Sequence, residues 1–229
     1  SLGLAINRKY PGTRIIGVSS RTAVTSALEL GAITEGYGYE DLEIAVRDAD
    51  LVVLCTPIHR IQGLLTVIAG FVKPGAVVTD VGSTKYAIAR HAAEVMPSGV
   101  WFIGGHPMTG SEKRGVLAGD PFLFQNAIYV LCPAMGVPDG VVKVFMHYLE
   151  RIGAAIIVLD AELHDKIAAA VSHLPQLLAV ALVEMIGGSH SDSAPYLTLA
   201  AGGFRDMTRI ASSPFVMWDD IYRTNTDAV

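Results

Sequence analysis

The sequence predicts an α/β protein, with a doubly wound parallel-sheet domain in residues 1–160 and an all-helical domain in residues 161–229. Three observations support this prediction. Short apolar runs rich in β-branched residues alternate with amphipathic stretches up to residue 160. No such run occurs beyond that point. The composition is 51% hydrophobic and 17% charged, which is enough apolar material for well-filled cores.

The predicted strands are nearly continuous apolar segments, as expected of strands that are buried on both faces. They lie at residues 14–18, 51–55, 76–80, 101–104, 127–132 and 155–160. Segments with helical spacing lie between them, at residues 21–30, 39–47, 58–71, 85–95 and 138–152. Strands that alternate with helices in this way predict parallel strands joined by crossover helices.

The second domain begins with a long apolar helix at residues 161–186, and glycine pairs at 187–188 and 202–203 interrupt the rest of the chain. The most apolar part of this helix, residues 174–186, is interrupted by Gln176 and Glu184. A membrane span needs roughly 20 apolar residues, so we expect no membrane association.

Charge and cysteine content narrow the class of protein. The net charge is −5 and no run of Lys or Arg occurs, so we expect no nucleic-acid partner. Cys55 and Cys132 alone provide no metal site and no disulfide framework, and residues 1–20 do not have the pattern of a secretory signal. A reducing cytoplasm is the expected location.

Both ends of the sequence have the character of helix interiors. Residues 1–6 have no starting Met and resemble the middle of a helix, as do residues 225–229. We therefore expect that sequence is missing at both ends.

Polar residues come directly after three of the predicted strands, where an open α/β sheet binds its ligands. They are Ser19, Ser20 and Arg21; Cys55, Thr56 and Pro57; and Gly82 and Ser83. The G-x-G-x-x-G loop of a Rossmann-like dinucleotide domain is not present, and we expect it, with the first strand, upstream of Ser1. The alternative is an α/β domain for another ligand.

The residue after the first predicted strand bears on the choice between NAD and NADP. An acidic residue there binds the ribose 2′-hydroxyl of NAD, but this sequence has Ser19, Ser20 and Arg21. Hydroxyls and a guanidinium suit a 2′-phosphate, which favours NADP. The alternative is a polar loop whose Arg21 is solvated.

Three segments carry candidate chemistry. His106 lies between Gly-Gly and Pro at a strand end, where it is either functional or a structural histidine. His173 and Gln176 share one face of the apolar helix, as a site or as a buried hydrogen bond between helices. Arg205 and Arg209 are four residues apart and suit a dianionic substrate. The alternative for this pair is a surface network with Asp206, Asp219 or Asp220.

Four motifs, in this order, resemble the prephenate/arogenate dehydrogenase family of tyrosine biosynthesis over nearly the whole chain. They are TDVGSTK at 79–85, GGHPMTG at 104–110, SHLP at 172–175 and GFRDMTRIA at 203–211. The resemblance implies oxidative decarboxylation of prephenate or arogenate, with hydride transfer to NAD or NADP. It also implies a homodimer.

The resemblance implies roles for individual residues. His106 is the base that takes the proton of the ring hydroxyl, Ser83 orients it, and Arg209 binds the ring carboxylate. The remaining residues that bind substrate or line its pocket are Arg205, Ser172, His173, Gln176, Thr109, Glu112 and Trp218. Some prephenate-preferring members have a histidine where this chain has Gln176, so the preference between prephenate and arogenate stays open.

Two other functions remain as alternatives. A β-hydroxyacid dehydrogenase or an imine-reducing enzyme also joins a dinucleotide domain to helices, but relies on Lys or on Ser/Thr groups in its helical region. A non-catalytic dinucleotide-binding module has no need of His106 opposite Arg209.

Overall fold

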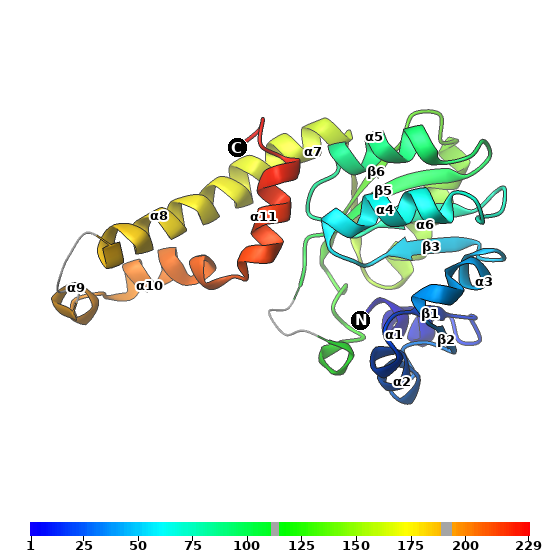
Figure 1. The fold of residues 1–229 in the computed structure, drawn as a ribbon, viewed down its shortest axis with the longest axis horizontal. Helices are drawn as coiled ribbons and strands as arrows, with labels where there is room; N and C mark the ends of the chain where they lie inside the picture. The colour runs from blue at the N-terminus through cyan, green and yellow to red at the C-terminus, as the bar shows by residue number, and fades with distance from the viewer. Residues whose placement is uncertain (111–114, 189–193) are drawn as a thin grey trace.

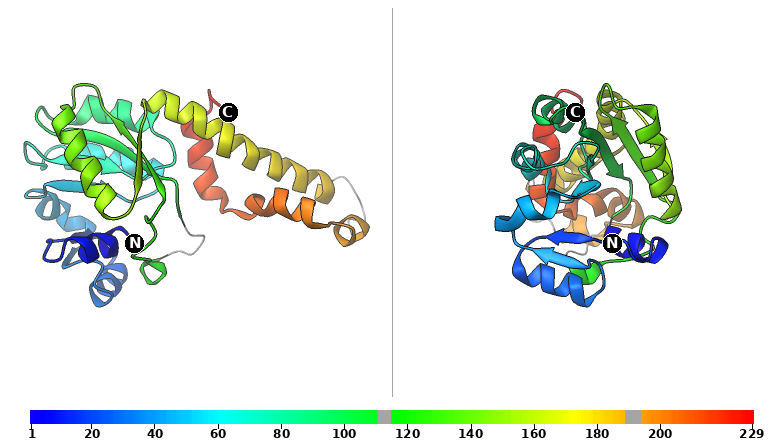
Figure 2. Two further views of the ribbon diagram at one scale, coloured as in Figure 1. Left: turned by 180° about the vertical axis from the view of Figure 1, so that it is seen from behind. Right: turned by 90° about the vertical axis from the view of Figure 1, so that its right-hand side faces the viewer.

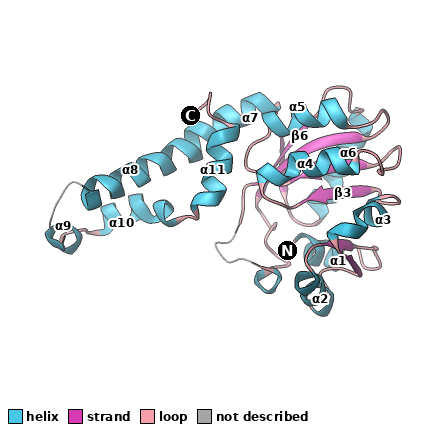
Figure 3. Ribbon diagram, viewed as in Figure 1, coloured by secondary structure: helices cyan, strands magenta, loops and turns pink. Residues whose placement is uncertain are grey.

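The computed structural model describes residues 1–110, 115–188 and 194–229. An α/β domain holds the first two thirds of the chain, and a helical arm extends from it (Figures 1 and 2). The fold class is as the sequence predicted, with strands and helices in alternation and then helices alone (Figure 3).

The sheet is in two parts. Strands β1 (Ile16–Val18) and β2 (Glu35–Tyr37) form a parallel pair. A five-stranded sheet has the order β3-β4-β5-β6-β7, formed by Leu51–Leu54, Val77–Asp80, Trp101–Pro107, Ile128–Pro133 and Ala155–Val158. The loops that follow β3 and β4 therefore lie at the same edge of the sheet, where α/β proteins of this kind bind ligands.

One strand pair departs from the prediction of a wholly parallel sheet. Strand β5 pairs antiparallel with β6, and His106 is opposite Val130 in this register. The described residues between them contain no crossover helix, and the chain reverses beside β5. Strand β2 was not predicted either, because its three residues Glu-Gly-Tyr have no apolar pattern.

Helices cover both faces of the larger sheet. Helices α4 (Ile58–Ile68) and α5 (Tyr86–Val95) contribute to a core with Val52, Val78 and Phe102. Helices α1 (Leu2–Lys9) and α6 (Asp139–Arg151) contribute to a second core with Ile103 and Leu131. Neighbours Phe102 and Ile103 thus point to opposite faces, as the alternation of side chains along a strand requires.

Short helices flank the smaller sheet and the loop after β5. They are α2 (Arg21–Glu29), the 3-10 turn η1 (Tyr39–Asp41), α3 (Leu42–Val46) and the 3-10 turn η2 (Val116–Ala118). The helix expected at residues 39–47 is therefore divided into η1 and α3.

The long helix of the second region contains an irregular turn. Helix α7 (Ala161–Ala168) continues into a π-helical turn, η3 (Ala169–His173), and then into α8 (Leu174–Gly188). Pro175 has no N–H to continue the regular ladder, so the wider turn is placed where proline weakens the helix.

The continuous run Ala161–Gly187 is 27 residues long and, by length and composition alone, could cross a membrane. The sequence argument considered only residues 174–186, whereas the whole helix is long enough for a span. Only 22% of its most apolar stretch is buried within the chain, so most of that stretch is available to another apolar surface.

Short helices complete the arm and return the chain to the sheet domain. Helices α9 (Ala194–Thr198) and α10 (Gly202–Thr208), with the 3-10 turn η4 (Arg209–Ser212), lead to α11 (Phe215–Thr224), which packs on α4 (Figure 1). Residues 225–229 were expected to be helical, but α11 ends at Thr224. The side chain of Asn225 instead donates to the backbone oxygen of Asp165, at 2.9 Å.

Polar contacts hold α7 and α11 against the sheet domain. The backbone N–H groups of Lys85 and Tyr86 donate to the carboxylate of Asp165. His59 bonds Asp220 at 2.8 Å, and the hydroxyls of Thr84 and Thr224 are 2.7 Å apart. These contacts fix the helical region beside the ends of β3 and β4, where a site between the two can form.

Candidate active site

A cavity of about 300 Å³ lies between the sheet domain and the helical region. Its walls include six of the residues that the sequence singled out: Ser83, His106, Thr109, Ser172, His173 and Trp218. The remaining lining residues are Pro107, Met108, Gly110, Ala168, Met217 and Ile221. The fold thus brings together polar groups that lie more than a hundred residues apart in the chain.

The backbone that carries His106 is held against the neighbouring strand β4. The N–H of Gly105 donates to the carboxylate of Asp80 at 3.2 Å. A Cβ at Gly105 would lie 2.6 Å from the backbone oxygen of Asp80, so this approach requires glycine. The Gly-Gly-His pattern therefore places the imidazole at the strand end through a close contact between backbones.

Asp80 organises the loop that carries Ser83. Its carboxylate accepts from the N–H of Gly82 at 2.8 Å and forms a short ion pair with Lys85. Asp80 and Lys85 are both buried, and loss of either would leave an unpaired buried charge. The pair therefore ties the end of β4 to the start of α5 beneath the cavity.

His106 is held in its neutral form. Burial lowers the pKa of His106 to about 3, and the charge of Lys85 contributes in the same direction. A neutral imidazole can accept a proton from a bound molecule, which a cationic one cannot.

Two groups of the helical region are donors that face this cavity. The Nδ1 of His173 lies 3.2 Å from the amide nitrogen of Asn225, and burial lowers the pKa of His173. An imidazole that accepts at Nδ1 and is neutral carries its proton on Nε2. The indole N–H of Trp218 is buried and has no partner among the described residues. Both donors suit an acceptor group on a bound molecule.

Other predicted substrate residues lie away from the cavity wall. Gln176 is buried, and its amide oxygen accepts a short hydrogen bond from the hydroxyl of Tyr222. Arg205 and Arg209 are exposed on α10 and at the start of η4. Glu112 lies outside the described residues.

The alternative for Arg205 and Arg209 was a surface network with nearby aspartates. Two of those aspartates have other partners. Asp219 pairs with Arg223, and Asp220 bonds His59.

The residues predicted to bind a cofactor lie near a second, larger cavity of about 1250 Å³ between β1 and β3. Ser19, Cys55 and Thr56 line it, whereas Ser20 and Arg21 are exposed at the start of α2, and Pro57 precedes α4. The hydroxyl of Thr56 is buried and has no partner among the described residues, which fits a polar ligand at this strand end.

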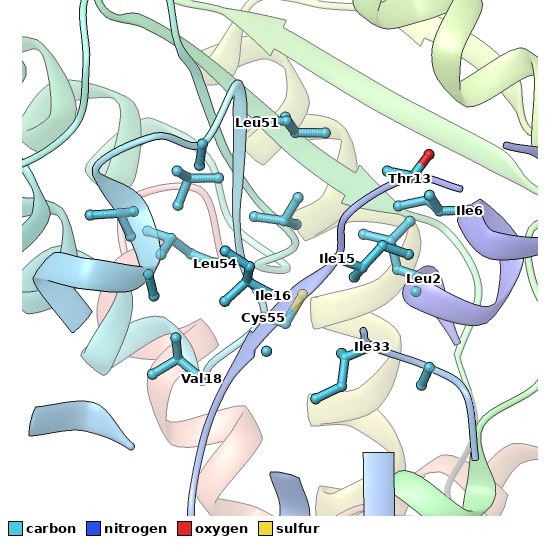
Figure 4. Close-up of a pocket in the computed structure, with 18 of the residues that line it drawn as sticks. Leu2, Ile6, Thr13, Ile15, Ile16, Val18, Ile33, Leu51, Leu54 and Cys55 are labelled. Carbon is cyan, nitrogen blue, oxygen red and sulfur yellow. The ribbon is translucent and has the colours of Figure 1, made fainter. Parts of the chain in front are cut away.

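The body of this cavity is apolar. Side chains of Ile15, Ile16, Leu51 and Leu54 approach one another across the gap between β1 and β3 (Figure 4). Polar dinucleotide phosphates do not suit such a wall, so only the rim at Ser19 and Thr56 fits a cofactor.

The sequence reasoning missed a pair of buried polar residues behind His106. His164 and Asp165, in the first turns of α7, are each 3% exposed, and His164 lies 2.9 Å from His106. Helical spacing could have pointed to His164, because it precedes Ala168 and Ser172 by four and eight residues, and these two residues line the cavity.

The groups assembled here do not include a metal site. Within residues 1–110, 115–188 and 194–229, no cluster of three or more His, Cys, Asp or Glu side chains could hold a metal ion.

Family models match both parts of the chain. Residues 2–158 match the nucleotide-binding domain of prephenate dehydrogenase, and residues 160–229 match its dimerization domain. Prephenate dehydrogenase of Bacillus subtilis is 37% identical over 231 residues, covering 100% of this chain and 62% of that protein. The chain thus spans less than two thirds of the length of this relative.

Solved structures agree with the sequence comparison. Prephenate dehydrogenase of Aquifex aeolicus, in complex with hydroxyphenyl propionate and NAD+, has a TM-score of 0.90 and 28% identity. That match covers 99% of this chain and 79% of the other. Arogenate dehydrogenase of Synechocystis has a TM-score of 0.85 and 32% identity, covering 99% of this chain and 80% of that one.

The fold and the shared cavity define a two-domain protein, in which a nucleotide-binding α/β domain and a helical domain form one site. Both domains match family models over almost every residue. The chain belongs to the prephenate dehydrogenase family.

Proposed function

We propose that this chain forms the catalytic core of a prephenate or arogenate dehydrogenase that serves tyrosine biosynthesis. Prephenate would lose a hydride and its ring carboxylate as carbon dioxide. Its hydroxyl proton would pass to a base and return to the phenolate oxygen, giving 4-hydroxyphenylpyruvate. The observation that carries the proposal is the cavity that joins His106 and Ser83 to Ser172, His173 and Trp218. Bound nicotinamide would accept the hydride.

His106 is the catalytic base in this proposal. Its imidazole is neutral and lines the cavity, so it can take the proton of the 4-hydroxyl. Ser83 lies in the same cavity, where its hydroxyl orients His106 or the substrate. The cavity is small enough that a bound ring excludes water from these groups.

Groups of the helical region bind the rest of the substrate. The free indole N–H of Trp218, the Nε2–H of His173 and the hydroxyl of Ser172 are the donors for the substrate's pyruvyl or alanyl side chain. Thr109 adds a hydroxyl at the opposite wall.

The other proposed substrate residues are Arg209 for the ring carboxylate, Arg205 for positive potential nearby, Gln176 for the substrate side chain, and Glu112, which lies outside the described residues. Arg209 is exposed and makes no ion pair within the described parts of the chain, so its guanidinium is available for an anion.

Residues 1–160 hold the cofactor in this proposal. Thr56 and Ser19 contact it at the rim of the larger cavity, with Cys55, Pro57, Gly82 and Ser83 at the neighbouring strand ends. The apolar gap between β1 and β3 is the place for one more parallel strand, which would bring a phosphate-binding loop to this rim. The cofactor is NAD or NADP, and Ser20 and Arg21 favour NADP.

Residues 161–229 also provide a surface for a second copy of the chain. Val171, Leu174, Leu178 and Met185 are exposed on the long helix, at spacings of three, four and seven residues. A stripe of this kind is typical of helices that pack against another helix. The match to a dimerization domain supports a homodimer over a membrane or a nucleic acid as the partner. The proposed location is the cytoplasm.

A steady-state assay tests this function. The full-length protein is incubated with prephenate or arogenate and with NAD or NADP, and reduced nicotinamide is followed by absorbance. Turnover with at least one of the four pairs is expected. The absence of turnover with all four would contradict the proposal, and the ratios of kcat/KM among them give the preferred substrate and cofactor.

A further inference from the structure

A chain of hydrogen bonds leads from His106 into the helical region. The Nδ1 of His106 lies 2.9 Å from the Nε2 of His164. The Nδ1 of His164 lies 2.7 Å from a carboxylate oxygen of Asp165. The rings of His106 and His164 meet at 67°, with centroids 5.1 Å apart. This arrangement connects a residue of the cavity wall to a buried acid.

The acid at the end of this chain is held as an acceptor. Asp165 accepts from the N–H of Lys85 at 2.7 Å and from the N–H of Tyr86 at 2.9 Å. These N–H groups begin α5 and occupy both carboxylate oxygens of Asp165 as acceptors. A carboxylate has no proton to give, so His164 must donate to it from Nδ1.

The position of one proton then fixes the next. With Nδ1 of His164 donating to Asp165, the Nε2 of His164 is left as the acceptor toward His106. His106 must donate to this acceptor from its own Nδ1. The Nε2 of His106 is left with a free lone pair, which is the form that a base requires.

No other titratable group described around His106 can replace His164 in this chain. Lys85 is occupied by its ion pair with Asp80, and His173 bonds Asn225 through its Nδ1. Of the charged and titratable groups described near His106, His164 is the one that forms a hydrogen bond with its ring.

We propose that Asp165 and His164 are positioning residues that set the tautomer of His106 and share the proton that it takes from the substrate. This inference rests on the proposed function. As the substrate O–H bond breaks, an N–H bond forms at Nε2 of His106. The proton on its Nδ1 moves toward Nε2 of His164, and the positive charge spreads to a ring whose other N–H faces Asp165. No further reactant is needed, because the proton returns to the phenolate oxygen of the product and His106 regains its neutral form.

Nuclear magnetic resonance of the imidazole nitrogens tests the tautomer without any turnover. In the free wild-type chain, His106 is expected to carry its proton on Nδ1. In Asp165→Asn, the new amide can donate to His164, which reverses the chain and moves the proton of His106 to Nε2. His106→Asn assigns the signal. A wild-type His106 protonated on Nε2 would overturn the proposal.

Kinetics test the sharing of the proton. Asp165→Asn is expected to lower kcat by at least about 10²-fold, with little change in KM. His164→Ala, which leaves the anchor of α5 intact, is expected to lower kcat by about 10-fold or more, and added imidazole should restore part of it. The matched control is His91→Ala, on α5 and hydrogen-bonded to Thr66, which should neither lose activity nor respond to imidazole.

The outcomes separate this inference from the proposed function. If the wild-type chain turns over substrate but His164→Ala retains its kcat, or loses it without any rescue by imidazole, the shared proton is wrong. If the tautomers follow the expected order but the wild-type chain turns over none of the substrates, the positioning stands and the proposed function fails.

Discussion

The backbone N–H of Gly105 donates to the carboxylate of Asp80, at 3.2 Å across neighbouring strands. This contact lies directly before His106, so the position of the imidazole depends on how closely β5 approaches β4. Small changes in backbone packing should therefore change catalysis as well as stability.

Gly105→Ala should both destabilise the chain and lower kcat. The added methyl would lie 2.6 Å from the backbone oxygen of Asp80, so the strands must separate. We expect a loss of about 1–3 kcal/mol in the free energy of unfolding, measured in urea. Gly104→Ala is the matched control, since the nearest atom to its added methyl is a side-chain carbon of Lys85 at 3.3 Å, a much less severe approach than that at Gly105. Equal effects of the two substitutions would contradict this explanation.

His106→Asn should remove the proposed catalytic base and little else. We expect kcat to fall by roughly 10²–10⁴-fold while KM changes little, because the contacts of the helical region with substrate remain. His147→Asn, on exposed α6, is the control and should leave both constants unchanged. Full activity of His106→Asn would show that another group takes the proton.

The pH dependence of stability should report the buried neutral histidines. The pKa of His106 is lowered to about 3, below its usual value of about 6.5 in the unfolded chain. The unfolded state therefore binds more protons between these values, and stability falls as the pH decreases from about 6.5 toward 3. For His106, the free energy of unfolding should be about 2 kcal/mol lower at pH 5 than at pH 7.

Urea unfolding at pH 7 and pH 5 measures this loss. His106→Asn should lose less stability on acidification than the wild-type chain. The pKa of His173 is also lowered by burial, so part of the dependence should remain in the variant. If His106→Asn and the wild-type chain lost the same stability between pH 7 and pH 5, a buried neutral His106 would be contradicted.

Arg209→Ala should weaken substrate binding with a smaller effect on kcat. A charge-assisted hydrogen bond to a carboxylate contributes about 1.5–3 kcal/mol, so KM should rise by roughly 10- to 100-fold. Arg223→Ala is the control, because that exposed arginine is already paired with Asp219. An unchanged KM for Arg209→Ala would remove it from the proposed carboxylate site.

Leu178→Glu should dissociate the proposed homodimer without unfolding the chain. Leu178 is 57% exposed, so the charge costs little in a single copy but is buried without a partner in a helix–helix interface. Sedimentation velocity should show the mass falling to that of one chain. Val144→Glu, on an exposed face of α6, should leave the mass unchanged, and so should Leu178→Glu if the interface lies elsewhere.

Periodicity predicted which segments are strands and helices, but not how the strands are oriented. A strand buried on both faces has the same apolar pattern in parallel and antiparallel pairs, so the reversal between β5 and β6 left no signal in the sequence. A further strand was expected upstream of Ser1, but its place between β1 and β3 was not predicted, because pairing depends on partners distant in the chain.

The cavity was predicted in part for a similar reason. His106 and His173 were recognised through unusual neighbours, a glycine pair and an apolar helix. His164 and Asp165 lie in the first turns of α7, whose many charged residues are typical of a solvent-exposed helix end. They are buried only because the helix packs against the sheet domain. Asn225 was taken for helix interior, although its amide ends the helix by bonding to α7.

The π-helical turn at Ala169–His173 holds one residue more than a regular α-helix would, and this extra residue sets the direction in which the side chains of α8 face. An α-helix rotates by about 100° per residue, so deleting one residue from this turn would restore a regular ladder and rotate the rest of α8 by that angle. His164 would keep its place beside His106, while the stripe containing Leu178 would face a different direction. In the proposed homodimer, the angle between the two copies would thus depend on a single inserted residue beside the cavity.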